Sequence, residues 1–144
     1  RWWHEKVDEK WLDTRNQAMA LLEKEDELQE IIRLVGPDAL PASDRMILEA
    51  SRMIREDFLQ QNAFDEIDTY CSSRKQYAIL KTILRYYNLC AEAVKNGADI
   101  ERIKNMKSKH EISRMRYIPE NQFTDETIKK INDLMDNEIR KVMK

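Results

Sequence analysis

Glycine and proline are scarce in this sequence, which contains 2 glycines and 3 prolines among its 144 residues. An average chain of this length carries about 17 such residues. β-Sandwiches, β-barrels and collagen-like or linker-rich chains need these residues at their turns or in their repeats, so the shortage argues against all of these classes. The sequence is therefore expected to be mostly helical.

An excess of one charge and long apolar runs are also missing. The chain has 25 Lys and Arg residues and 27 Asp and Glu residues, and this balance lacks the basic excess of a dedicated nucleic-acid-binding protein. No run of about 18 apolar residues is present to span a membrane, and no apolar core marks a signal peptide. We therefore expect no nucleic acid as a partner and no direct insertion into the membrane.

The hydrophobic residues recur at three- and four-residue steps, a period that predicts α-helices. Helices are expected over residues 8–35, 42–60 and 73–95, in an interrupted segment over 100–116, and from residue 125 toward the C-terminus. The predicted fold class is all-α: an antiparallel bundle of five to six helices. The apolar face of the first helix consists of Ala18, Leu21, Leu22, Leu28, Ile31, Ile32 and Val35.

A proline-rich turn separates the first two predicted helices. Gly36 and Pro37 stop the first helix, and Pro41 stiffens the turn. Helix, tight turn and helix make an antiparallel hairpin whose turn projects from the bundle, while Leu40 is expected to pin the turn to the bundle. We call this turn the hairpin tip; its candidate contact residues are Gly36, Pro37, Asp38, Ala39, Leu40, Pro41, Ser43 and Asp44.

Motifs for self-sufficient catalysis are missing from the sequence. Two glycines 61 residues apart, Gly36 and Gly97, cannot build a phosphate-binding loop or a dinucleotide fingerprint. His4 and His110 are isolated, and no HExxH or CxxC spacing offers a metal site. Taken alone, these residues predict a binding or coupling module with no metal and no catalytic residue.

Two local features allow both a structural and a functional interpretation. Phe64 lies among polar neighbours, and composition alone favours packing of this ring on the core. A basic cluster is more often a solvated face than a phosphate contact on a near-neutral chain. Its members are Lys104, Lys107, Lys109, His110, Arg114 and Arg116.

Two linked segments resemble a known family. Residues 31–41, IIRLVGPDALP, resemble the helix end and loop in the C-terminal domain of rotary ATPase catalytic subunits. Residues 55–65, REDFLQQNAFD, resemble the nucleotide-facing stretch of the same domain, and residues 68–71 and 75–76 also suit it. The match is to the catalytic A subunits of archaeal A-type and vacuolar-type ATPases, over nearly the whole chain and strongest from about Leu28 to Leu84.

The resemblance implies that residues 1–144 are the C-terminal helical bundle domain of a catalytic A subunit. The family's N-terminal barrel and central nucleotide-binding domain would then be absent from this sequence. Because the phosphate-binding loop, the Mg²⁺ ligands and the catalytic glutamate belong to that central domain, no catalytic residue is assigned here. ATP or ADP with Mg²⁺ would be bound by the complete subunit, and this chain alone is expected to be inactive.

The resemblance also implies two contact regions. In the family the hairpin tip bears on the rotating central stalk; here Pro41 and Ser43 replace a denser acidic run of F-type relatives, and Asp38 and Asp44 remain. The second region completes the adenine pocket. There an aromatic side chain closes over the base, which reverses the interpretation of Phe64. The predicted adenine-pocket residues are Gln60, Gln61, Ala63 and Phe64.

A third implication concerns cysteine. Cys71 lies at the position of a cysteine that acts as a redox switch in some vacuolar relatives, but its partner is not in this chain. A buried free thiol therefore remains the favoured interpretation. Cys90 is likewise expected as a free thiol in a reducing compartment.

As a member of this family, the chain is expected in the head of a proton- or sodium-translocating ATPase, which is cytoplasmic and peripheral to the membrane. Its expected partners are the central-stalk subunits, the alternating B subunits of the hexameric head and the other domains of its own catalytic subunit. The alternative is a stand-alone helical scaffold or protein-interaction domain without a nucleotide role.

Overall fold

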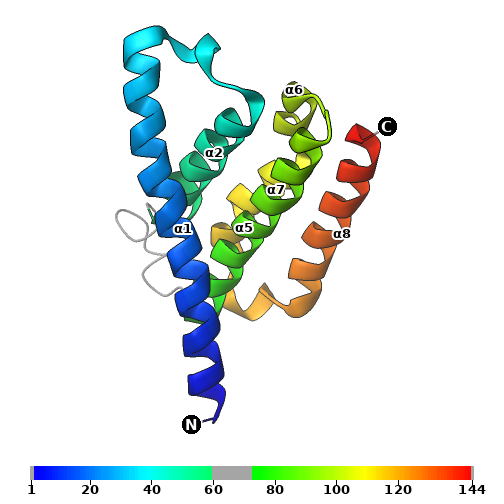
Figure 1. The fold of residues 1–144 in the computed structure, drawn as a ribbon. Coiled ribbons are helices and arrows are strands. Elements are labelled where there is room, and N and C mark those ends of the chain that lie inside the picture. Colours follow the sequence, from blue (N-terminus) through cyan, green and yellow to red (C-terminus); the bar gives the residue numbers. More distant parts are fainter. Residues whose placement is uncertain (1, 60–72, 144) are drawn as a thin grey trace.

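The computed structural model describes the backbone of residues 2–59 and 73–143, and the side chains of residues 10–59 and 74–143. Within these ranges the chain is helical and contains no strand, which confirms the predicted all-α class (Figure 1). The elements are α1 (Trp2–Val35), the 3-10 turn η1 (Pro37–Ala39), α2 (Ala42–Met53), the π-helical segment η2 (Ile54–Leu59), α5 (Ser73–Lys95), α6 (Ile100–Lys104), α7 (Lys107–Arg114), the 3-10 turns η3 (Met115–Tyr117) and η4 (Glu120–Gln122), and α8 (Asp125–Val142).

Helix α5 is the centre of the bundle. It contacts α1, α2, α7 and α8, and in Figure 1 it runs between α1 and α8. Its apolar residues recur at helical spacing and face inward, where they join buried residues of every neighbouring helix. The side chains of α5 that are at most 1% exposed and apolar are Ile79, Leu80, Ile83, Tyr86 and Cys90.

Both glycines end helices, as predicted. Gly36 follows α1 with a φ of 89° and Gly97 follows α5 with a φ of 97°, a backbone conformation that residues with a Cβ adopt rarely. After α5, the amide of Ala98 bonds to the carbonyl of Ala93 and the amide of Gly97 to that of Val94, which is the Schellman pattern. These two stops set the lengths of α1 and α5.

The last helix also begins where the sequence predicts. Thr124 precedes α8 in an extended conformation, and its backbone N–H donates to the Oγ1 of Thr127 at 3.3 Å. Asp125 and Glu126 lie in the first turn, where the helix dipole favours acidic side chains. The start of α8 is thus determined by local sequence.

Helix α1 ends at Val35 as predicted, but its start and the burial of its last turns differ from the prediction. It begins at Trp2 rather than near residue 8, since no glycine or proline interrupts residues 2–8. Its predicted apolar face is buried at Ala18, Leu21 and Leu28, but Ile31 and Val35 are 42% and 65% exposed. The reason is that α1 extends past the other helices toward the hairpin tip, so its last turns have no neighbour on that side (Figure 1).

Candidate functional site

The hairpin tip is a short, ordered connection. Pro37–Ala39 form the 3-10 turn η1, and Pro41 directly precedes α2 in an extended conformation. Leu40 is 6% exposed and buried apart from the main core cluster, which fits the predicted role of holding the turn down. The remaining tip residues include exposed Pro37, Asp38, Ala39, Pro41 and Ser43 and half-buried Asp44, with Ser43 and Asp44 already in the first turn of α2.

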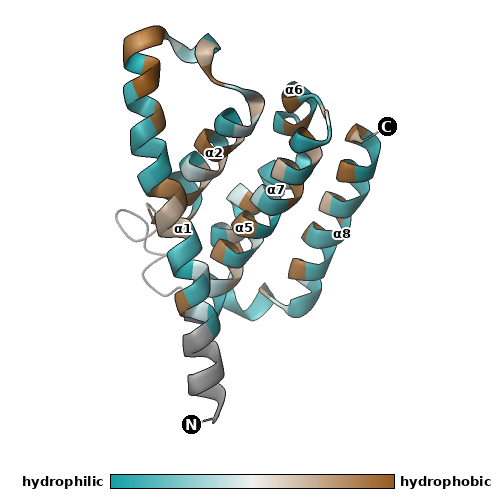
Figure 2. Ribbon diagram, in the orientation of Figure 1, coloured by the Kyte–Doolittle hydropathy of each residue, from teal (hydrophilic) through white to brown (hydrophobic). Residues whose placement is uncertain are grey.

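An apolar surface adjoins the hairpin tip and was not predicted as a contact region. Leu34 and Val35 are 79% and 65% exposed, and Ile31 is 42% exposed. Figure 2 shows these last turns of α1 as strongly hydrophobic at the projecting end of the helix. We call Ile31, Leu34 and Val35 the apolar tip. The sequence signal for this surface is a set of apolar residues directly before the Gly36-Pro37 stop. Because the helix ends there, α1 has no later turn that could pack against them.

The predicted adenine-pocket residues Gln60, Gln61, Ala63 and Phe64 lie outside the described residues, as does Cys71. The structure therefore describes the two flanks of this stretch: η2, which ends at Leu59, and α5, which begins at Ser73. A π-helical segment such as η2 is rare and is frequently found at functional sites.

Both flanks contact α1. The guanidinium of Arg55 in η2 donates to both carboxylate oxygens of Glu25, with Nη2 to Oε2 at 2.6 Å and Nε to Oε1 at 3.1 Å. Such a bidentate pair fixes geometry as well as charge. The ring of Trp11 lies between Phe58 of η2, at 6.2 Å between centroids, and Tyr77 of α5, at 5.7 Å. One α1 side chain thus touches both flanks.

The flanks are also bound to the segment between α7 and α8. The Nζ of Lys75 donates to the carbonyl of Arg116 at 2.9 Å and to that of Ile118 at 2.6 Å. Arg74 Nη2 donates to the carbonyl of Phe123 at 2.6 Å, and Arg116 Nη1 donates to the carbonyl of Glu56 on the other flank. Three cations therefore connect both flanks to residues 115–123.

Asp57 in η2 is a buried acid beside this connection. Its side chain lines a cleft of about 590 Å³ between α2–η2 and α6–α7, together with Glu56 and Arg52. Burial raises the pKa of Asp57 to about 6; Glu56 adds to the rise, whereas Arg116 and Arg52 oppose it. The carboxyl thus changes charge in the folded chain at a pH where an exposed aspartate is already ionised.

The stability of the chain should therefore depend on pH through Asp57. Between about pH 4 and pH 6 the folded state binds a proton that the unfolded state does not, so this contribution to stability declines as the pH rises through that window. We expect the free energy of unfolding of the wild type to fall by about 1–2 kcal/mol from pH 4 to pH 7, relative to that of Asp57→Asn. Solvent screening at the cleft makes this change smaller than the full pKa difference would give. Urea denaturation of both chains across this range measures the difference, and a pH-independent difference would contradict the assignment.

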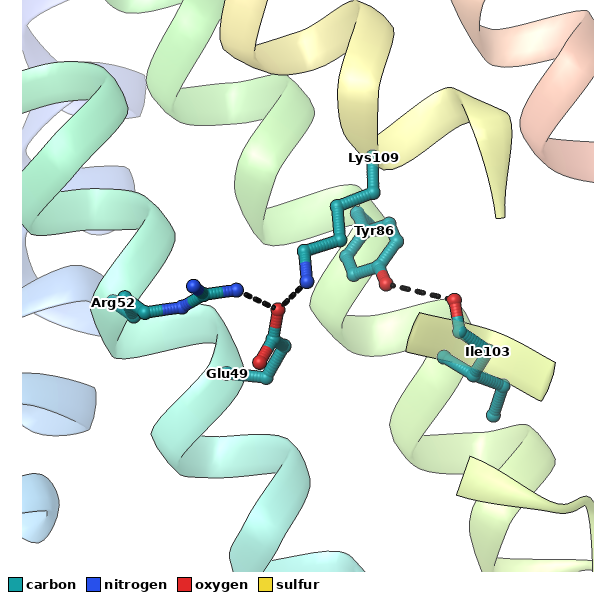
Figure 3. A network of polar contacts seen from close by, with 5 residues as sticks. All are labelled: Glu49, Arg52, Tyr86, Ile103 and Lys109. Atoms are coloured by element: carbon teal, nitrogen blue, oxygen red, sulfur yellow. Dashed lines mark hydrogen bonds and ion pairs between the residues drawn. The ribbon is translucent and has the colours of Figure 1, made fainter. Parts of the chain in front are cut away.

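Arg52 and Lys109, which line the same cleft, belong to a polar network. The side chain of Glu49 in α2 is 8% exposed and pairs with Arg52 at 2.6 Å and with Lys109 of α7 through the same oxygen (Figure 3). Burial lowers the pKa of Lys109. Beside this pair, the hydroxyl of buried Tyr86 donates to the carbonyl of Ile103 at 3.3 Å. The contacts join α2 to α7 and α5 to α6.

The basic cluster predicted from the sequence is thus divided by the fold. Lys109 and Arg116 make internal contacts, whereas Lys104, Lys107 and His110 are exposed along the cleft. The exposed members fit the solvated face favoured above. The structural roles of Lys109 and Arg116 were not predicted, because their partners are distant in sequence.

Among the described residues, no group of three or more His, Cys, Asp and Glu side chains is placed to hold a metal ion. The free thiol of Cys90 is buried in the core, and burial raises its pKa to about 12. A thiol with this environment is unreactive. None of the helices in the described ranges has the length and apolar character required to cross a bilayer.

Comparison with known proteins shows which family this chain belongs to. Residues 1–104 match the family described as the C-terminal domain of V and A type ATP synthase. The chain belongs to this family. Both strings that carry the resemblance, residues 31–41 and 55–65, lie within the matched residues.

Relatives of this chain include A subunits of A-type ATP synthases. The chain is 56% identical over 122 residues to the A subunit of the A-type ATP synthase of Methanosphaera stadtmanae, and the match covers 85% of this chain and 21% of the relative. It is 48% identical over 143 residues to the corresponding protein of Methanopyrus kandleri, where the match covers 99% of this chain and 24% of the relative. The chain thus spans about a fifth to a quarter of these proteins.

Proposed function

We propose that this chain is the C-terminal helical domain of the ATP-hydrolysing and ATP-synthesising A subunit of an A/V-type rotary ATPase. In this role it completes the adenine pocket and couples nucleotide turnover to rotation of the central stalk. The observation that carries the proposal is the identity of 56%, over 85% of the chain, to the A subunit of an A-type ATP synthase. Activity would then belong to the complete subunit within its complex.

The hairpin tip supports the coupling role. A contact that transmits force must be stiff and must include an exposed surface that a partner can bind. Pro37 and Pro41 fix two backbone torsions of the turn, and buried Leu40 holds it to the bundle. The exposed side chains of Leu34 and Val35 provide apolar area that a stalk helix would cover. The contact surface we propose is therefore mainly apolar, with Asp38 at its edge.

The adenine role rests on Phe64 and its neighbours. An aromatic ring offers a rigid stacking surface for a base, and amide side chains such as those of Gln60 and Gln61 hydrogen-bond at a pocket rim. Ala63 would allow close approach of the backbone. Since no phosphate-binding loop is present in these 144 residues, the phosphates and Mg²⁺ would be bound by the rest of the subunit.

The remaining partners follow from the same proposal. The chain would contact the other domains of its own catalytic subunit, and it would lie beside alternating B subunits in the head, on the cytoplasmic side and peripheral to the membrane. The direction of the reaction and the transported ion, proton or sodium, would be determined outside this domain. For Cys71 a free thiol remains our proposal.

ATP binding by the isolated chain tests whether the phosphates and Mg²⁺ are bound by the rest of the subunit. We expect millimolar affinity or weaker, because the charged phosphates provide the strongest anchor for a nucleotide and the sequence contains no phosphate-binding loop. Isothermal titration of the isolated chain and of the complete catalytic subunit with ATP and Mg²⁺ measures the contrast. Micromolar binding by the chain alone would contradict the proposal, and millimolar binding by the complete subunit would do so as well.

A further inference from the structure

The two flanks of residues 60–72 are tied to one short piece of chain. This piece, residues 115–123, contains η3 and η4 and connects α7 to α8; we call it the strap. On the incoming flank, Arg116 of the strap donates to the carbonyl of Glu56, three residues before the end of η2. On the outgoing flank, Arg74 and Lys75 in the first turn of α5 donate to strap carbonyls. The same strap thus holds both flanks.

Burial makes the outgoing attachment strong. Lys75 is 1% exposed, and a lysine is almost never fully buried unless its ammonium has partners. Its Nζ donates to the carbonyls of Arg116 and Ile118 and lies 5.6 Å from the centre of the Phe123 ring. Hydrogen bonds from a charged donor are about twice as strong as neutral ones. The strap is therefore fixed to the start of α5 over most of its length.

Arg116 connects the two attachments. Its backbone carbonyl accepts from Lys75 of the outgoing flank, and its guanidinium donates to the carbonyl of Glu56 on the incoming flank. The guanidinium also donates to the hydroxyl of Tyr117 at 2.7 Å and lies over that ring at 4.7 Å, which limits its rotamers. One residue thus contacts both of the chain ends between which residues 60–72 run.

We propose that Arg74, Lys75 and Arg116 are positioning residues for nucleotide binding: through the strap they hold the two flanks of the adenine-contacting stretch in place. This inference rests on the proposed function for the role of that stretch. Fixing both ends of a segment lowers the conformational entropy that binding must remove, so it favours nucleotide affinity rather than the chemical step. The strap lies beyond residues 1–104, which match the family description.

The test uses the complete catalytic subunit in its ATPase complex, with steady-state kinetics for ATP. Arg116→Gln and Arg74→Gln each remove a charged donor, and we expect either to raise KM for ATP about five- to tenfold while kcat changes less than about twofold. Arg116→Lys keeps a charged donor and should restore most of the affinity. The matched control is Arg102→Gln, which removes an Arg-to-carbonyl bond of 3.0 Å to Lys141, away from the strap.

Two further measurements keep the positioning role separate from the proposed function. Phe64→Ala is measured beside these variants. If it raises KM whereas Arg116→Gln and Arg74→Gln behave like Arg102→Gln, the positioning role is wrong and the adenine contact stands. If Phe64→Ala leaves KM unchanged, the adenine contact fails and the positioning role fails with it. Hydrogen exchange of the amides at residues 55–59 and 73–76 should accelerate in Arg116→Gln relative to Arg102→Gln. Equal exchange in the two variants would show that the strap does not hold the flanks.

Discussion

Replacing Leu34 and Val35 together by aspartate should uncouple ATP hydrolysis from rotation in the complete ATPase while leaving the bundle intact. Both side chains are more than half exposed, so the substitution removes little internal packing. A stalk surface that covers them would lose about 1.5–3 kcal/mol for each apolar side chain and would face two new charges. We expect the ratio of ions transported to ATP hydrolysed to fall at least about tenfold.

The measurement is ion transport and ATP hydrolysis in the same reconstituted vesicles, with the melting temperature of the variant as a check on folding. Met19→Asp is the matched control, because Met19 is 48% exposed on the same helix but lies about 15 residues before the tip, or roughly 22 Å along the axis. This control should couple like the wild type. Unchanged coupling in the double aspartate variant would show that the apolar tip is not the stalk contact.

Replacing Phe64 by alanine in the complete subunit should raise the KM for ATP about tenfold or more. Stacking of a base on an aromatic side chain is worth about 1–3 kcal/mol by alanine substitution. The proposed contact is to the base, which does not react, so kcat should change much less than KM. Steady-state hydrolysis at varied ATP concentration, with the binding of a fluorescent adenine nucleotide as a second readout, measures the effect.

Phe64→Tyr is the conservative partner of this variant, since it keeps a ring of nearly the same size, and its KM should stay near that of the wild type. An unchanged KM in Phe64→Ala would refute the stacking role. A collapse of kcat with an unchanged KM would also refute it, because such a result indicates a contact made only in the transition state.

Local sequence was sufficient for most of the secondary structure. The stops at Gly36 and Gly97 and the start at Thr124 were predicted correctly, because they depend on backbone torsions and neighbouring donors within one helical turn. The start of α1 was placed too late, and the π-helical geometry of η2 was not predicted at all. No residue type in Ile54–Leu59 signals that widening.

The tip shows where periodicity misleads. Ala18 and Val35 share one apolar helical face, yet Ala18 is buried and Val35 is exposed. A period of three and four residues shows which face is apolar, but only the position of the neighbouring helices decides how much of that face is covered. The apolar tip therefore required the tertiary structure.

The shortage of glycine and proline, with the apolar period, determined by itself that this chain is a helical bundle with a projecting hairpin, and two strings of residues identified its family. Only the tertiary structure decided that Leu34 and Val35 are exposed at the tip. It also decided that Arg74 and Lys75 bind the strap and that Arg116 of the strap binds η2. The physical reason is range: caps and periods act within a few residues, whereas the Lys75 and Arg116 contacts join positions 41 to 60 residues apart.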